Sequence, residues 1–283
     1  MNNKLLSLIQ PTEFLEIYQN KDLVIVDASN GKNAKLNYVE KHIDNAIYVD
    51  LNSQLADVND NLANGGRHPL PRIDRFAKTL KEIGISKNSH VVIYDDKCGA
   101  NAAARFWWML KSIGHEKVQV LDGGIQEAEK IGLKMSNKVQ KNKIVEDYEF
   151  TSWKLPIVEI DEVEENSMKQ NSLIIDVREN IRYRGEMEPI DLIAGHIPNS
   201  INIPFSTNLD STGMFLPLNE LKLKYLNLFS NREIKDLIVH CGSGVTACHT
   251  ILALDYVGFE IPKLYVGSWS EWSRNNKKVI TEK

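Results

Sequence analysis

The chain has 283 residues, of which 42% are hydrophobic and 25% are charged, and its formal net charge at pH 7 is −4. This is the composition of an ordinary globular protein rather than of a disordered or fibrous one. Because its 34 Lys and Arg residues are spread along the chain instead of forming basic clusters, we expect no nucleic-acid partner and no binding to membranes.

Short apolar runs bounded by polar or turn residues predict buried strands along the whole chain. In chain order these runs are Leu23–Val26, Val91–Tyr94, Leu173–Ile175, Ile201–Ile203 and Leu237–Val239. Two segments, 102–113 and 247–257, carry apolar residues at helical spacing, and each is followed by a glycine that ends a helix. Alternating strands and helices predict an α/β fold with mostly parallel sheets flanked by helices, in which ligands bind at the carboxyl ends of the strands.

Four sequence blocks of the first half recur in the same order in the second half. LVIVDAS at 23–29 resembles LIIDVRE at 173–179, and HIDNAIYVDL at 42–51 resembles HIPNSINIPF at 196–205. HVVIYDD at 90–96 matches DLIVHCG at 236–242, and the block at 118–132 matches that at 262–276. This repeat predicts a duplicated domain. We expect a first domain over residues 1–134, a polar linker over 135–157 and a second domain over 158–283.

The cysteine count and the lack of long apolar runs predict the location of the protein. Its three cysteines are an odd number, which does not describe a disulfide framework and favours a reducing compartment. No run approaches the roughly 18 apolar residues of a membrane span, and the N-terminal apolar run before Gln10 is too short for a signal peptide. We therefore expect a cytoplasmic protein, which we take to be monomeric.

The segment VHCGSGVTACH (239–249) places Cys241 at the end of a predicted strand, before a tight loop of small residues and a predicted helix. Backbone N–H groups of such a loop form an anion-binding nest, and the helix N-terminus adds positive potential, so both favour a thiolate. A cysteine phosphatase uses a similar loop but needs an arginine six positions after the cysteine, which grips two phosphate oxygens. Position 247 is Ala, so this clamp is missing. A phosphatase or arsenate reductase function is therefore kept only as an alternative.

Both halves resemble rhodanese domains, and the whole chain is similar to the tandem-domain thiosulfate and 3-mercaptopyruvate sulfurtransferases. The resemblance rests on CGSGVTAC, GHIPNSINIP and GSWSEW, and it covers nearly all of the chain. It implies that the second domain is catalytic with Cys241 as its nucleophile. In the first domain, Asp95 stands at the position that matches Cys241.

The activity that the resemblance implies is sulfur transfer in two steps. The cysteine thiolate takes the outer sulfur of a small anionic donor, 3-mercaptopyruvate or thiosulfate, and the persulfide passes it to cyanide, a small thiol or a protein thiol. No metal and no organic cofactor is implied. A non-catalytic sulfur-delivery module would be the alternative if the second domain had lost its cysteine, but Cys241 is present.

The resemblance also implies binding residues around Cys241. Arg182 in IRYRG matches the family's donor-binding arginine, and Arg184, two positions on in an extended segment, would point to the same side. Ser243 would hydrogen-bond the leaving group with His42 as its support, and Arg67 in GGRHPLP would add charge near the cleft. The loop residues expected around the donor sulfur are Gly242, Gly244, Val245 and Thr246.

Donor choice is the point on which the residues give mixed signals. The uncharged loop with Ser243 favours mercaptopyruvate, because thiosulfate carries two negative charges and the loop offers no Lys or Arg. The mercaptopyruvate branch usually has a second arginine a little after Arg182, but EMEPIDLIAGH (186–196) has none, and Asn33 stands where the family has an aspartate. We expect both donors to be used, with mercaptopyruvate preferred. The role of Cys98, as an incidental thiol or as a redox partner of Cys241, stays open.

Overall fold

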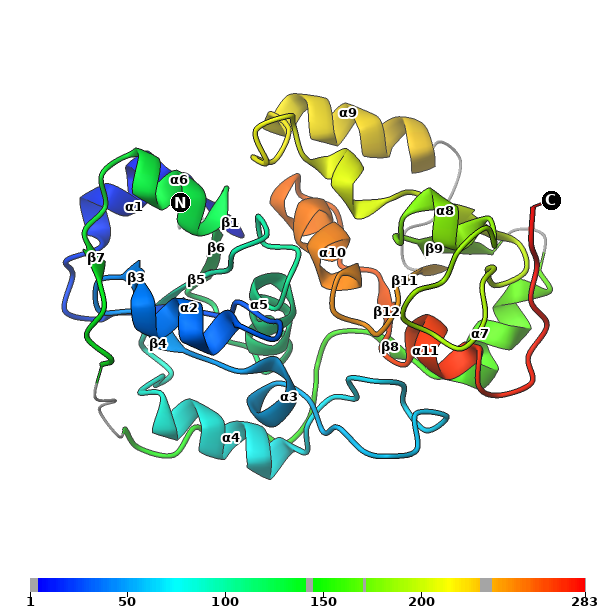
Figure 1. The fold of residues 1–283 in the computed structure, drawn as a ribbon, viewed down its shortest axis with the longest axis horizontal. Helices are drawn as coiled ribbons and strands as arrows, with labels where there is room; N and C mark the ends of the chain where they lie inside the picture. Colours follow the sequence, from blue (N-terminus) through cyan, green and yellow to red (C-terminus); the bar gives the residue numbers. More distant parts are fainter. Residues whose placement is uncertain (1–4, 141–144, 170–171, 230–235, 283) are drawn as a thin grey trace. The chain divides into compact units, whose positions relative to one another are not determined.

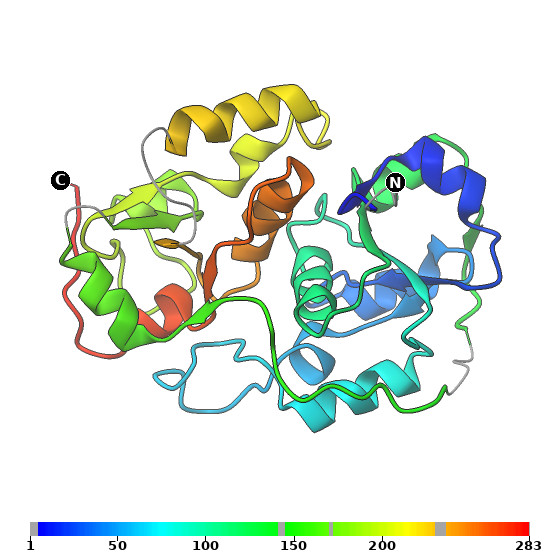
Figure 2. The ribbon, with the colours of Figure 1, turned by 180° about the vertical axis from the view of Figure 1, so that it is seen from behind.

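The computed structural model describes residues 5–140, 145–169, 172–229 and 236–282, and Figures 1 and 2 show its ribbon from two opposite sides. The chain forms two compact units. Unit 1 consists of Met1–Ala56, Pro71–Lys154 and Ser211–Phe215. Unit 2 consists of Asp57–Leu70, Leu155–Asp210 and Leu216–Lys283. Each half of the sequence therefore contributes a short segment to the unit that is formed mainly by the other half.

Unit 1 is built on a parallel sheet with the strand order β1-β6-β5-β2-β4. These strands are β1 (Leu8–Ile9), β6 (Val118–Leu121), β5 (His90–Tyr94), β2 (Leu23–Asp27) and β4 (Ile47–Tyr48). The central strands β2 and β5 are almost entirely apolar, as parallel strands covered on both faces must be, and they pair along their whole length. A separate antiparallel ladder joins β3 (His42–Ile43) to β7 (Met135–Ser136).

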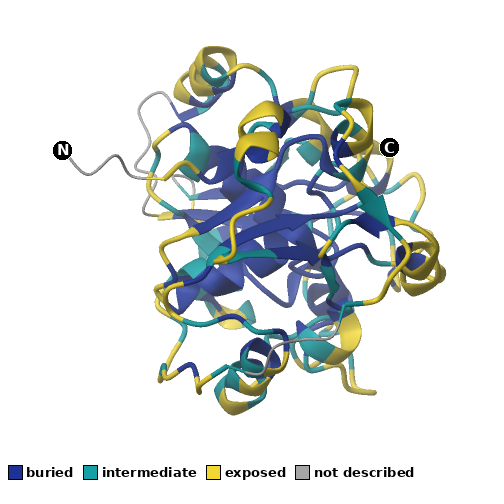
Figure 3. Ribbon diagram, turned by 90° about the vertical axis from the view of Figure 1, so that its left-hand side faces the viewer, coloured by how far each residue is buried: buried dark blue, intermediate teal, exposed yellow. Residues whose placement is uncertain are grey.

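Helices cover both faces of this sheet. On one face, α1 (Pro11–Ile17) and α6 (Gly124–Lys130) contribute Phe14 and Ala128 to a core with alternate residues of β5. α5 (Ala103–Ser112) packs against β5 and β6, and its Phe106 contacts Phe76 of α4 (Ile73–Glu82) edge to face. The short helices α2 (Ala34–Glu40) and α3 (Leu51–Gln54) complete the unit. Figure 3 shows the strands as buried and the outer sides of the surrounding helices as exposed.

Unit 2 has a parallel sheet with the order β10-β9-β11-β12-β8. Its strands are β8 (Ile157–Val158), β9 (Leu173–Asp176), β10 (Ser200–Asn202), β11 (Leu237–His240) and β12 (Lys263–Tyr265), and its helices are α7 (Ile160–Ser167), α8 (Asn180–Tyr183), η1 (Phe205–Asn208), α9 (Leu218–Phe229), α10 (Ala247–Tyr256) and α11 (Ser268–Trp272). α7 and α11 share one core with the sheet, whereas α10 packs against β11 and α9. Within the described ranges no helix is long and apolar enough to cross a membrane.

The two sheets follow one topology. Strands β1, β6, β5, β2 and β4 of unit 1 occupy the same order as β8, β12, β11, β9 and β10 of unit 2. The antiparallel ladder that begins at His42 also has a counterpart, a single bridge between His196 and Ile280. The predicted α/β fold with two similar, mostly parallel sheets is therefore confirmed.

The expected linker over 135–157 differs from what the structure shows. Met135–Ser136 form β7, and the ring of Trp153 lies 5.3 Å from that of Phe76 and 6.3 Å from that of Trp108. The described residues of the stretch 135–154 thus belong to unit 1. The polar composition of this stretch concealed the few apolar side chains that pack it onto the domain.

Candidate active site

Cys241 directly follows β11 and stands six residues before α10 begins, at the carboxyl edge of the unit 2 sheet where ligands of parallel α/β folds bind. The residue is 3% exposed and lines a cavity of about 120 Å³. The other lining residues are Arg67, Val177, Arg178, Glu179, Arg182, Ile190, Phe205, Gly242, Ser243 and Thr246. All of them belong to unit 2. The structure thus brings five predicted residues together with Cys241, namely Arg67, Arg182, Gly242, Ser243 and Thr246.

The loop after Cys241 is held in shape by Ser268. Its Oγ accepts hydrogen bonds from the N–H groups of Cys241 (3.2 Å) and Gly244 (2.9 Å) and donates one to the carbonyl of Tyr265 (2.8 Å). Gly244 has a φ of +69°, and a Cβ there would lie 2.4 Å from the carbonyl oxygen of Val266, so only glycine fits. We had expected Gly244 around the donor sulfur, but its N–H fixes the loop and the residue does not line the cavity.

Other backbone donors of this loop are available to an anion. Among the residues that the structure describes, the N–H groups of Gly242, Ser243, Val245 and Thr246 donate to no protein acceptor. They precede the N-terminus of α10, where unpaired N–H groups and the helix dipole favour negative charge. Val245 does not line the cavity, so its predicted contribution is limited to its backbone. The arrangement suits a thiolate or a persulfide anion.

The matching loop of unit 1 holds an anion at the position of Cys241. Asp95 follows β5 as Cys241 follows β11. Its Oδ1 accepts hydrogen bonds from the N–H groups of Lys97 and Gly99 (2.9 and 2.8 Å), and its Oδ2 accepts those of Asn101 and Ala103 (2.9 and 3.2 Å). Burial raises the pKa of Asp95 to about 6, although these hydrogen bonds lower it. In this fold, the end of the central strand is therefore a place where backbone N–H groups bind negative charge.

Ser243 is paired with a histidine, but not with the expected one. The Ser243 Oγ lies 2.8 Å from Nδ1 of His68. His42 makes its contacts within unit 1: its Nδ1 lies 2.5 Å from the carbonyl oxygen of Tyr38, and its ring stacks on that of Tyr38. The histidine His196 of unit 2 makes the same contacts with Tyr183. Within unit 2 the histidine that contacts Ser243 is thus His68, and His42 and His196 are equivalent residues of the two domains.

Arg182 lies at the cavity and Arg184 does not. Asn180–Tyr183 form the helix α8 rather than an extended segment, so two positions along the chain turn a side chain by about 200° instead of returning it to the same side. The Arg184 side chain is 45% exposed and pairs with Glu186 (3.0 Å) and Glu282 (3.7 Å). The prediction that Arg184 binds the donor is corrected on this geometry.

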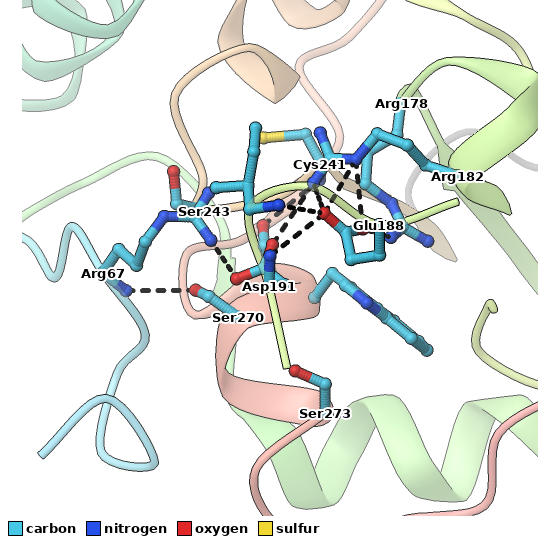
Figure 4. A network of polar contacts seen from close by, with 12 residues as sticks. Arg67, Arg178, Arg182, Glu188, Asp191, Cys241, Ser243, Ser270 and Ser273 are labelled. Atoms are coloured by element: carbon cyan, nitrogen blue, oxygen red, sulfur yellow. Dashed lines mark hydrogen bonds and ion pairs between the residues drawn. The ribbon is translucent and has the colours of Figure 1, made fainter. Parts of the chain in front are cut away.

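Arg182 belongs to a chain of buried ion pairs, here called the arginine network and shown in part in Figure 4. Its members are Arg67, Asp176, Arg178, Arg182, Glu188, Asp191 and Arg274. Arg178 bridges Asp176 (2.6 Å) and Glu188 (3.1 Å), and Arg182 bridges Glu188 (2.8 Å) and Asp191 (3.3 Å). Burial alone would raise the pKa of Glu188, but its bonds with Arg182 lower it below the usual value. Glu188 is therefore charged at neutral pH.

The segment of unit 2 that carries Arg67 and His68 is fastened next to the loop that follows Cys241. The N–H of Arg67 donates to Ser270 Oγ (3.0 Å), and the N–H of Gly65 donates to Glu271 Oε1 (2.8 Å). The N–H of Ser270 donates in turn to the carbonyl of Gly242 (2.8 Å). The helix α11, which the sequence marks as GSWSEW, thus joins the 57–70 segment to the loop of Cys241.

Sequence reasoning missed four residues of this site: His68, Arg178, Glu188 and Asp191. Arg178 lies in the repeated block LIIDVRE, and His68 follows Arg67 in GGRHPLP. Glu188 and Asp191 lie in the segment whose missing arginine drew attention. A charged residue next to an apolar run is usually solvated, so only their burial distinguishes these residues.

Comparison with known proteins identifies the family and the fold. The Rhodanese-like domain family matches residues 10–130 and 159–275. A protein of Pseudomonas aeruginosa named "Probable 3-mercaptopyruvate sulfurtransferase" is 38% identical over 245 residues, which cover 86% of this chain and 85% of that protein. Thiosulfate/3-mercaptopyruvate sulfurtransferase 2 of Arabidopsis thaliana is 34% identical over 282 residues, covering 89% of this chain and 80% of that protein.

Solved structures agree with these relatives. The 3-mercaptopyruvate sulfurtransferase from Leishmania major superposes with a TM-score of 0.83 at 27% identity, covering 95% of this chain and 74% of that chain. Two tandem parallel α/β units with a cysteine after the central strand of the second are the arrangement of a rhodanese-type protein. The chain therefore belongs to the rhodanese family, with two domains in tandem, and it is an enzyme of the sulfurtransferase class.

Proposed function

We propose that this enzyme moves a sulfane sulfur from 3-mercaptopyruvate or thiosulfate, through a persulfide on Cys241, to a thiophilic acceptor. The observation that carries the proposal is the cavity of about 120 Å³ in which Cys241 meets three arginines and a serine paired with a histidine. A cavity of this size admits a donor of only a few heavy atoms. The relatives with 3-mercaptopyruvate and thiosulfate in their names support these two donors.

In the first step the Cys241 thiolate attacks the terminal sulfur of the donor and forms an S–S bond. With 3-mercaptopyruvate the C–S bond breaks, and its electron pair leaves with the carbon as the enolate of pyruvate, which then takes a proton. With thiosulfate the S–S bond of the donor breaks and sulfite leaves. The unpaired N–H groups of the loop stabilise the thiolate before the attack and the persulfide anion after it.

Ser243 and His68 act on the leaving group. A hydroxyl has one proton, so Ser243 can donate to an enolate oxygen only while His68 Nδ1 donates to Ser243 Oγ. The 2.8 Å contact between these atoms allows that arrangement. The pair would stabilise the negative charge that develops on the enolate of mercaptopyruvate, whereas sulfite leaves without such help. We therefore expect mercaptopyruvate to be the preferred donor.

Arg67 and Arg182 bind the negative end of the donor. Both line the cavity, and both place a guanidinium nitrogen near Gly242, the residue after the nucleophile. Guanidinium groups form short, charge-assisted hydrogen bonds with carboxylates and sulfonates. Arg67 thus supplies a second positive charge at a site where the segment 186–196 contains no arginine.

The second step returns the enzyme to its starting state. A thiolate acceptor attacks the outer sulfur, the S–S bond to Cys241 breaks, and its electron pair restores the Cys241 thiolate. Cyanide would take the same sulfur and leave as thiocyanate. The electrons balance without a metal or organic cofactor. We propose that the enzyme is monomeric and that it lies in the reducing cytoplasm.

Mass spectrometry of the intact protein tests the proposal. After incubation with either donor alone, the protein should gain the mass of one sulfur atom, and cyanide should remove it. Cys241→Ser should gain none, because serine forms no alkoxide at neutral pH. The matched control is Cys248→Ser, a buried cysteine of α10 that does not line the cavity, and it should load as the unmodified protein does. Sulfur retained on the Cys241→Ser protein would refute the assignment.

A further inference from the structure

Asp191 lies at the branch point of the arginine network, next to the loop of Cys241 (Figure 4). Its side chain is 0% exposed. Its Oδ1 binds Nη1 of Arg67 and Nη1 of Arg274, the latter at 3.3 Å, and its Oδ2 binds Nη2 of Arg182, also at 3.3 Å. One carboxylate therefore joins three guanidinium groups, of which Arg67 and Arg182 line the cavity and Arg274 does not.

These charges converge on the residue that follows the nucleophile. A Cβ placed on Gly242 would lie 3.0 Å from Arg67 Nη2, 3.4 Å from Arg182 Nη2 and 3.6 Å from Asp191 Oδ2. Arg67 binds Asp191 through Nη1, and in the described part of the chain its Nη2 has no hydrogen-bond partner. Asp191 thus holds Arg67 in a position that leaves one face of the guanidinium group for a ligand.

Asp191 also decides how much positive charge the site carries. The arginine network contains four guanidinium groups and three carboxylates, which leaves one net positive charge. Glu179, whose side chain is 55% exposed at the cavity and lies 3.8 Å from Arg182, reduces this further. Burial lowers the pKa of His240, the residue before Cys241, so it adds no positive charge. Without the carboxylate of Asp191 the site would be more positive by one unit.

We infer that Asp191 is a positioning residue which limits the charge of the donor site, so that the site favours a donor with one negative charge over a donor with two. The inference rests on the proposed function. At neutral pH a thiol-bearing 2-oxo carboxylate carries one negative charge, whereas thiosulfate carries two. A unit charge about 4 Å away changes the binding of one additional charge by roughly fivefold even at the dielectric constant of bulk water, and by more in a partly buried site.

Two substitutions in the same network should move donor selectivity in opposite directions. Asp191→Asn removes a negative charge and keeps an oxygen that accepts a hydrogen bond, so the kcat/KM ratio of mercaptopyruvate to thiosulfate should fall by at least about fivefold, mainly through the KM of thiosulfate. Arg274→Gln removes a positive charge and keeps a donor for the carbonyl of Ser270, which Arg274 Nη1 binds at 2.7 Å. In that variant the ratio should rise by a similar factor.

The opposite signs separate charge from loosened packing, because a merely structural defect would lower both donors in both variants. Asp191→Glu, which restores the charge, should bring the ratio back toward that of the unmodified enzyme. Arg274 is 20% exposed at its side chain, so Arg274→Gln still decides the question if the buried Asp191→Asn variant fails to fold. Ratios that stay unchanged, or that move in the same direction in both variants, would overturn the inference. An unmodified enzyme that takes sulfur from neither donor would instead overturn the proposed function and this inference with it.

Discussion

Replacing Arg182 with alanine should impair both donor use and stability. The two losses have different causes, and the contacts of Arg182 allow each to be estimated. The guanidinium group lines the cavity, and the loss of one charge-assisted contact to the donor corresponds to about 1.5–3 kcal/mol, or about tenfold to a hundredfold in kcat/KM. The same change removes a buried partner of Glu188 and Asp191, whose side chains are 2% and 0% exposed. Breaking a buried ion pair costs about 3–5 kcal/mol.

The loss of stability should lie near the lower end of this range, at about 3 kcal/mol. Glu188 keeps its contact with Arg178 and the N–H of Asp191, and Asp191 keeps Arg67 and Arg274. Urea unfolding measures the stability, and initial rates with each donor and cyanide measure donor use.

The matched control is Arg184→Ala, two residues away on the exposed side of the chain. Its ion pairs with Glu186 and Glu282 are exposed, so its removal should cost less than about 1 kcal/mol and leave kcat/KM within twofold. Arg182→Lys should give an intermediate loss, since it keeps the charge but not the planar fork. Equal kinetic losses in Arg182→Ala and Arg184→Ala would refute the placement of the donor site.

Three further changes test other parts of the site. His68→Ala should lower kcat with mercaptopyruvate by about a hundredfold and kcat with thiosulfate much less. The control His42→Ala should affect stability and leave the ratio of the kcat values for the two donors unchanged. Equal losses of kcat with both donors in His68→Ala would argue against the pairing of His68 with Ser243. Gly242→Ala places a Cβ 3.0 Å from Arg67 Nη2, so KM should rise severalfold with little change in kcat or in urea unfolding, and an unchanged KM would show that Arg67 does not contact the donor. Burial raises the pKa of Asp95 from 3.8 to about 6, so the folded chain holds this proton more tightly than the unfolded chain does. The free energy of unfolding should therefore fall by about 3 kcal/mol as pH rises from about 4 to about 6 and then level off. Asp95→Asn should lack this fall in urea unfolding measured between pH 4 and pH 7, and an equal slope in both proteins would contradict the raised pKa.

The sequence by itself was enough to predict the duplicated α/β fold and the position of Cys241. Apolar runs such as 173–175 and 237–239 are short and continuous because central parallel strands are buried on both faces, and that burial leaves a pattern readable in one dimension. The small residues after Cys241 have a local cause as well, since a tight turn from strand to helix constrains each position of the loop. Position 244 illustrates this, because its positive φ and the nearby carbonyl of Val266 require glycine.

Only the tertiary structure decided which charged residues serve the site. Arg182 and Arg184 look equivalent in the sequence, but α8 directs one to the cavity and the other to solvent. The sequence pointed to His42 as the support of Ser243, whereas the histidine that contacts Ser243 is His68, from the segment 57–70 that belongs to unit 2. The burial of Asp191 among three arginines is a property of the tertiary structure alone. The physical reason is that a buried ion pair depends on partners brought from distant parts of the chain, and neither periodicity nor local propensity records which partners meet.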